Sequence, residues 1–211
     1  MGRWEERYLE GEARLPDDPD ERQRQLTRLG NVAWGAGLSA LLEGQRDAAV
    51  EWLDRAAGRY RESYELAPPG SWGRPIAILK ARLLAGRDAR ADAEWTLEQG
   101  AVESESPVGR YAATLALLVL ERWHDARHVA ASLQGRDDFP PAVADALIAI
   151  AAEGVVAYIE SVEDVLLTFE TRAEFLEDVQ IADTVLVLQL LAAQRDLAAD
   201  LGPSPLLPSL R

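Results

Sequence analysis

The chain has 211 residues, of which 48% are hydrophobic and 27% are charged, and its formal net charge is −14 at pH 7. This charge opposes binding to nucleic acid or to an anionic membrane, and the lack of cysteine excludes disulfides, thiolate metal sites and cysteine nucleophiles. Alanine, leucine, arginine and glutamate dominate while β-branched residues are few, and this composition predicts one all-α domain.

The N-terminal segment, residues 1–18, is charged from its start and lacks the apolar core of a secretory signal. The longest apolar stretch carries Asp145 and Glu153, and the apolar run at 184–193 is about half as long as a bilayer requires. We therefore expect a cytoplasmic protein that does not enter a membrane.

The first strong helix signal begins after residue 17. Asp18 is a favoured N-cap and Pro19 a favoured first helical residue, so we expect a helix from Pro19 to about Glu43, ended by Gly44. A second helix restarts at Asp47 and stops before the prolines at 68 and 69. The short turn at Gly44 predicts that these two helices form an antiparallel pair.

Two more pairs follow along the chain. One joins a helix at 75–85 to a helix at 88–99 through a turn at Gly86. The other begins at Pro107, with Ser106 as its N-cap, runs to about Leu120, breaks near 121–124, and continues to about 133.

The sequence becomes more apolar from Pro141 onward, where a long apolar helix is expected to run to about Glu160. Ser161 and Thr171 each precede an acidic residue three positions on, which predicts two further capped segments. A last helix is expected at 183–201. The resulting organisation is an N-terminal segment 1–18, a helix-pair region 19–134, C-terminal helices 135–201 and a proline-rich tail 202–211.

Small and large residues of the first pair fall on a recurring pattern: Gly37, Gly44, Ala49, Leu53 and Ala56. On these residues, the unit at about 31–61 resembles a tetratricopeptide repeat, in which small residues let two helices approach closely. The second helix pair departs from the repeat pattern at Leu79 and Glu98, and the third pair has Glu121 in place of the turn glycine. The resemblance implies helix pairs stacked in a right-handed superhelix. The alternative is a helical bundle; in both, the C-terminal apolar helices pack on the pairs.

The resemblance also implies a concave groove lined by the first helix of each pair. The positions facing it would be Asn31, Trp34, Leu38 and Leu41 in the first pair, and Tyr111, Leu115 and Leu118 in the third. Because these positions are mostly apolar, we expect the groove either to bind an apolar helix or strand of a partner or to be filled by the chain's own helix after residue 141. We expect Trp34 to be partly exposed there as a binding anchor, and Trp52 and Trp95 to be core residues.

The chain's two histidines, His124 and His128, are spaced i, i+4, as in helices that bind zinc, with Asp125 between them. A metal-dependent hydrolase is therefore one alternative. The arginines at 122 and 127 disfavour a cation, and a third ligand cannot be identified, so we expect an exposed histidine pair, no metal, no cofactor and no catalysis. The acidic residues at 170, 174, 177 and 178 are expected to form a solvated helix face.

These patterns predict a non-catalytic scaffold or binding module whose partner is another protein, either basic or contributing an apolar helix. The last helix and tail resemble the ends of some all-helical bacterial immunity proteins, which makes a toxin-neutralising function an alternative. Leu206, Leu207 and Leu210 in the tail should pack back on the last helix or dock on another copy, giving a homo-oligomer.

Overall fold

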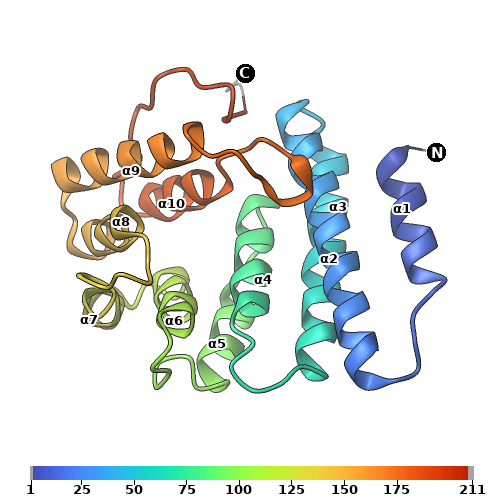
Figure 1. Ribbon diagram of the computed structural model, residues 1–211. Helices are drawn as coiled ribbons and strands as arrows, with labels where there is room; N and C mark the ends of the chain where they lie inside the picture. The colour runs from blue at the N-terminus through green and yellow to red at the C-terminus, as the bar shows by residue number, and fades with distance from the viewer. Residues whose placement is uncertain (1, 209–211) are drawn as a thin grey trace. The chain divides into compact units, whose positions relative to one another are not determined.

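The computed structural model describes residues 2–208, which form ten α-helices and one 3-10 turn without any β-strand (Figure 1). The helices are α1 (Arg3–Glu12), α2 (Pro19–Leu42), α3 (Arg46–Glu65), α4 (Gly73–Leu84), α5 (Arg90–Glu98), α6 (Pro107–Val119), α7 (Trp123–Ala131), α8 (Pro141–Ala152), α9 (Val155–Glu170) and α10 (Asp183–Ala193), with the turn η1 at Leu176–Asp178. The all-α prediction is confirmed. In this described part, every helix is too short or too polar to cross a membrane.

The described residues fold into two compact units, between which the chain passes more than once. The first unit contains residues 2–87, 173–181 and 207–208, and the second contains 88–172 and 182–206. The ranges expected from the sequence cross this division: residues 2–18 of the N-terminal segment lie in the first unit, while 19–134 is shared by both. Residues 209–211 of the expected tail lie outside the described part.

Consecutive helices pack against each other within each unit, as the expected helix pairs require. In the first unit α2 packs on α1 and α3, and α3 packs on α4; in the second, each helix from α5 to α9 packs on the next. The helices of the expected second pair, α4 and α5, belong to different units.

The longest helix, α2, forms the centre of the first unit and has half of its 24 residues buried. Glycines let α3 approach it closely. A Cβ atom on Gly37 would lie 2.7 Å from Leu53 Cγ, and one on Gly30 would lie 2.7 Å from the Tyr60 ring. The small-against-large contact of Gly37 and Leu53 is the one that the repeat-like spacing predicts.

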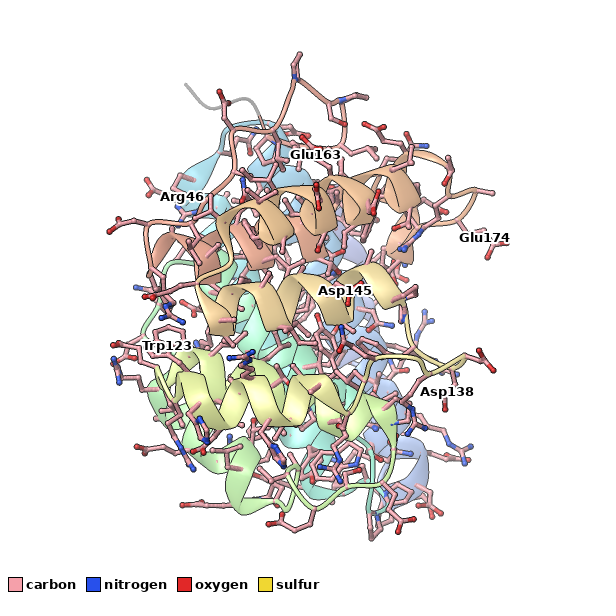
Figure 2. The ribbon with its side chains drawn as sticks, turned by 90° about the vertical axis from the view of Figure 1, so that its left-hand side faces the viewer. Arg46, Trp123, Asp138, Asp145, Glu163 and Glu174 are labelled. Carbon is pink, nitrogen blue, oxygen red and sulfur yellow. The ribbon has the colours of Figure 1, made fainter. Side chains whose placement is uncertain are left out.

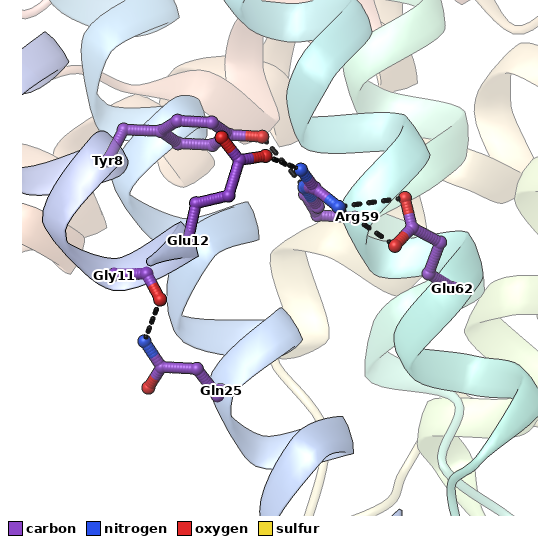
Figure 3. Close-up of polar contacts among 6 residues, drawn as sticks. All are labelled: Tyr8, Gly11, Glu12, Gln25, Arg59 and Glu62. Carbon is purple, nitrogen blue, oxygen red and sulfur yellow. Dashed lines mark hydrogen bonds and ion pairs between the residues drawn. The ribbon is translucent and has the colours of Figure 1, made fainter. Parts of the chain in front are cut away.

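The N-terminal helix α1, which the sequence patterns did not indicate, packs on α2 and is tied to α3 by Arg59 (Figure 3). The Arg59 guanidinium donates to the Tyr8 hydroxyl at 2.7 Å, to Glu62 at 2.9 Å and to Glu12. Burial opposes its charge, but the contacts with Tyr8 and Glu62 outweigh that effect and raise the pKa of Arg59. Gln25 of α2 also donates to the Gly11 carbonyl at 2.9 Å.

Alternate helices, namely α2, α4, α6, α8 and α10, end in the same kind of turn. A residue just past each helix has a left-handed backbone with φ between 56° and 72°: Gly44, Gly86, Glu121, Glu153 and Asp196. The next N–H then donates to the carbonyl five residues earlier at 2.8–3.0 Å, which is the Schellman pattern. The turns expected at Gly44, Gly86 and 121 are confirmed, and two more follow them.

In the second unit, α10 packs against α8 and α9, and Arg195 fastens the end of α8. The Arg195 guanidinium donates to the backbone carbonyls of Ile150 and Ala151 at 3.0 and 2.7 Å and forms an ion pair with Glu153 at 2.5 Å. It also lies 4.6 Å from the centre of the Trp123 ring of α7. These carbonyls belong to the last turn of α8, where few backbone donors remain, and the Ile150 carbonyl accepts only a long backbone bond, from the Glu153 N–H at 3.4 Å.

Several C-terminal expectations are wrong. The expected helix 141–160 is interrupted, because Glu153 has φ +58° and α9 starts only at Val155. Ser161 lies inside α9 and donates to the Ala157 carbonyl instead of capping a helix. Thr171 ends α9 rather than starting a helix, and only η1 follows it.

The last helix stops at Ala193 instead of residue 201. The backbone turns at Asp196, and Gln189 holds the loop beyond it by bonding to both the N–H and the carbonyl of Ala199. Leu206 of the tail lies in the second unit, where the Ala182 N–H donates to its carbonyl at 2.9 Å, whereas residues 207–208 belong to the first unit. Leu206 is buried, whereas Leu210 lies outside the described residues.

We expect Gly37→Ala to destabilise the protein by about 1–3 kcal/mol, because the new methyl group would collide with Leu53 between two packed helices. Gly58, inside α3, is the matched control, since nothing lies within 4 Å of a Cβ built on it. Gly58→Ala should stabilise the protein by about 0.5–1 kcal/mol through better helix propensity. Urea unfolding checks both values, and equal effects of the two substitutions would refute the close approach.

Replacing Arg195 with methionine keeps an aliphatic side chain but removes the donors to α8. We expect a loss of about 2–3 kcal/mol in urea unfolding and faster amide exchange in the last turn of α8. Arg127, exposed on α7, provides the control, and Arg127→Met should stay within about 0.5 kcal/mol of the parent. Unchanged exchange in α8 after Arg195→Met would show that the carbonyl contacts do not hold the helix end.

Candidate functional site

The residues expected to line a groove on α2 are mostly interior. The Trp34 side chain is only 5% exposed and its ring lies 5.8 Å from Lys80 Nζ of α4, and Leu38 is buried as well. Leu41 is half-buried, and the Asn31 side-chain oxygen accepts a hydrogen bond from the Tyr60 hydroxyl at 2.8 Å. The expectation of a partly exposed Trp34 is therefore wrong.

The groove residues expected on α6 belong to the second unit. Leu115 and Leu118 are fully buried, and the half-buried Tyr111 ring packs against Phe139 with its centre 5.5 Å away. Apolar residues that pack tightly against their own unit stabilise the fold. Partner binding through the α2 and α6 positions stays an untested prediction.

Two tryptophans expected in the core, Trp52 and Trp95, are only half-buried. The Trp52 ring lies edge-on to Tyr8, with the ring centres 5.6 Å apart, and the Arg55 guanidinium is 4.5 Å from its centre. An aromatic ring can thus be covered by an arginine side chain and a neighbouring ring while part of it remains in water.

The histidine pair lies on the exposed side of α7, as expected, while Ala126 is buried. His124 and His128 line a shallow cavity of about 380 Å³ whose other walls include Leu117 and Val129. Asp125 lines it too, but one of its oxygens accepts two hydrogen bonds from Arg122, at 2.7 and 2.9 Å. Within residues 2–208, no three His, Cys, Asp or Glu side chains are arranged to hold a metal ion.

The acidic residues at 170–178 do not form the single solvated helix face that was expected. Glu170 ends α9 and accepts a hydrogen bond from Ser204 at 2.9 Å, whereas Glu177 belongs to η1 in the first unit. Glu177 is paired with Arg7 at 2.7 Å and its side chain is only 15% exposed. Glu170 and Glu177 therefore contact side chains that are distant in the sequence.

A different surface emerges on α9. Its inner side buries Tyr158, Val162, Val165, Leu166 and Phe169. Its outer side exposes Val155, Val156, Ile159 and Leu167 together with Glu160, Glu163 and Asp164, and we name these seven residues the α9 outer surface. Val156 is 68% exposed and Leu167 is 56% exposed, which are high values for apolar side chains.

The α9 outer surface rests on a firm support. The buried Tyr158 hydroxyl donates to the Gln189 side chain of α10 at 2.7 Å. Burial raises the pKa of Tyr158 well above its usual value, so the hydroxyl keeps its proton and remains a donor. Packing on α8 and α10 fixes which side of α9 faces outward.

Negative charge is concentrated around this surface. Residues 137–172 contain eight acidic residues and one arginine, so this stretch carries −7 of the chain's net −14. Lys, Arg and His are all absent from residues 141–171. Figure 2 shows α9, α8 and α7 stacked one above another, with Glu163 on the uppermost helix and Asp145 below it on α8.

The three central carboxylates of the α9 outer surface are unpaired. Glu160, Glu163 and Asp164 are exposed, and they form no ion pair or side-chain hydrogen bond with the described residues. Other acidic residues nearby are engaged: Glu153 with Arg195, and Asp138 with Arg136 at 2.8 Å. The Arg136 hydrogen bond lowers the pKa of Asp138. Within residues 137–172, carboxylates without an ion pair or side-chain hydrogen bond are therefore concentrated at the middle of α9.

Comparisons with family models, with curated proteins and with solved structures find no match to this chain. The resemblance to tetratricopeptide repeats therefore has no family-level support. What stands is an all-helical protein whose helices pack in chain order.

Sequence reasoning missed the α9 outer surface for an identifiable reason. The net charge of the whole chain hides the excess of acidic residues at 137–172, which appears only when the charge is summed by segment. The break after Glu153 was also missed, so the outward-facing residues of α9 could not be assigned to one side of a separate helix.

The burial of Trp34 yields a direct test. Trp34→Ala should destabilise the protein by about 3–5 kcal/mol, because it removes a large ring from a packed interior. Trp52→Ala, at a half-buried site, should have a clearly smaller effect. Urea unfolding monitored by circular dichroism distinguishes them. If Trp34→Ala unfolds at the urea concentration of the parent protein, the ring is not part of the core.

Proposed function

We propose that this protein is a non-catalytic interaction module that binds another protein through the α9 outer surface. The observation that supports this most directly is the gathering of exposed apolar side chains on one helix. Nine large hydrophobic residues are exposed in the described part, and four of them are Val155, Val156, Ile159 and Leu167 of α9. Single exposed apolar residues are ordinary, but a group on one face indicates an interaction site.

The support beneath α9 favours such a role. The helix is held by α8 and α10, and its hydrogen bond to Gln189 is internal, so its outer side chains are presented without further folding. A pre-formed surface loses little conformational freedom when a partner binds. The exposed carboxylates between these apolar residues add charged groups that can fix the orientation of a bound partner.

A toxin-neutralising role is the second candidate, and the concentration of negative charge at 137–172 favours it. An acidic inhibitor suits a basic toxin because complementary charge speeds their association. A gene for a toxic basic protein beside the gene for this protein would support this candidate, and its absence would remove it.

Site-specific photo-cross-linking in lysate of the source organism tests the proposed function. A benzophenone amino acid at Val156 should cross-link one predominant protein, whereas the same group at Val108, which is exposed on α6, should not. Adding Leu167→Gln, eleven positions from the probe, should reduce the yield from Val156 at least about tenfold because it removes apolar contact area.

The Leu167→Gln substitution distinguishes specific cross-linking at α9 from non-specific cross-linking. A product that forms equally from Val156 and Val108, or one that persists at full yield with Leu167→Gln, would show that α9 is not the binding surface. Circular dichroism of the Leu167→Gln protein serves as the folding control, and an unchanged spectrum is expected because the side chain is exposed.

A further inference from the structure

The α9 outer surface has a definite order along the helix. Val156, Glu160, Glu163 and Leu167 are spaced by four, three and four residues, so they lie on one side of α9. Val156 and Leu167 are eleven residues apart, which corresponds to about 16 Å along a helix. Apolar side chains therefore mark both ends of this line, and unpaired carboxylates occupy its middle.

The spacing of these four residues along α9 favours a helix of the partner as the bound element. Spacings of three and four residues produce the ridges into which the side chains of another helix pack. An added β-strand would need an open sheet edge, and the described residues contain no strand. A partner helix of about three turns would span the line from Val156 to Leu167.

The negative charge of the α9 outer surface determines which kind of helix can bind there. A second copy of this chain would bring Glu160, Glu163 and Asp164 against the same residues of its partner, and like charges in contact are repulsive. Nucleic acid and anionic membranes are repelled for the same reason. A purely apolar helix would cover three carboxylates without offering them a partner, which is costly.

We infer that the partner presents a cationic amphipathic helix to the α9 outer surface, an inference that rests on the proposed function. Its apolar side chains contact Val156 and Ile159 at one end and Leu167 at the other. Arginine or lysine side chains between them pair with Glu160, Glu163 and Asp164. The ion pairs lie at a solvated surface, so they act mainly on association rate and salt dependence.

Two synthetic peptides of equal length test this inference. Both are alanine-rich helices with leucines placed to meet the two apolar ends, and they differ only in having arginine or glutamine at the central positions. Fluorescence anisotropy should show at least about tenfold tighter binding of the arginine peptide at low salt, and most of this advantage should vanish at about 1 M salt, where charges are screened.

A triple variant of the protein identifies the carboxylates involved. Glu160→Gln, Glu163→Gln and Asp164→Asn together should make the two peptides bind with equal affinity. The control removes carboxylates elsewhere, with Glu94→Gln and Glu98→Gln on α5, where both residues are exposed, and it should retain the preference for arginine. The inference is overturned if the triple variant still prefers the arginine peptide.

The outcomes separate this inference from the proposed function. If both peptides bind equally to the parent protein and Leu167→Gln weakens both, α9 is a binding surface but is not selective for a cationic helix. If neither peptide binds, the cationic helix is ruled out, and cross-linking from Val156 still decides whether α9 binds a protein.

Discussion

The Schellman turn that ends every second helix is the constraint on which the rest of this fold depends. Each such turn stops a helix at a fixed residue and starts the reversal that leads the chain onward. At Gly44 and Gly86 the backbone adopts the left-handed conformation easily, because glycine has no Cβ atom to collide with the carbonyl. At Glu121, Glu153 and Asp196 a side chain is present, so neighbouring contacts have to compensate for the strain.

The turn at Glu153 shows how such compensation creates a surface. Arg195 binds the final carbonyls of α8 and pairs with Glu153, while the Gly154 N–H donates to Ala149. If α8 continued instead, the valines at 155 and 156 would extend its axis rather than begin a new helix. The outward position of Val156 and Leu167 therefore depends on an arginine that lies beyond α10.

The sequence predicted the first part of the chain better than the last, and the difference has a physical cause. Helix starts are predicted by local capping contacts, as at Asp18–Pro19 and Ser106–Pro107. A turn at Gly44 is predicted because glycine adopts the left-handed conformation without help from other residues. The end of α8 is instead decided by Arg195, more than forty residues away, and the left-handed position falls on Glu153 while the adjacent Gly154 has negative φ. Local patterns cannot reveal a cap supplied from such a distance.

The candidate site follows the same division. The spacing correctly predicted that His124 and His128 are exposed, because in a nine-residue helix with Ala126 buried these two residues lie on the side that faces solvent. Spacing alone could not place Trp34, since whether a helix side faces a groove or the interior depends on packing from other elements, here including Lys80 of α4. The unpaired state of the α9 carboxylates likewise depends on which arginines are engaged elsewhere.

The path of the chain also bears on how this protein could evolve. After α9 the chain supplies residues 173–181 to the first unit, where Glu177 meets Arg7 and packs against Gly35, and it then returns to the second unit for α10. No single uninterrupted stretch of the gene therefore encodes either unit. Exon shuffling or duplication could not copy one of them intact, so the two units are expected to be inherited, lost and diversified together.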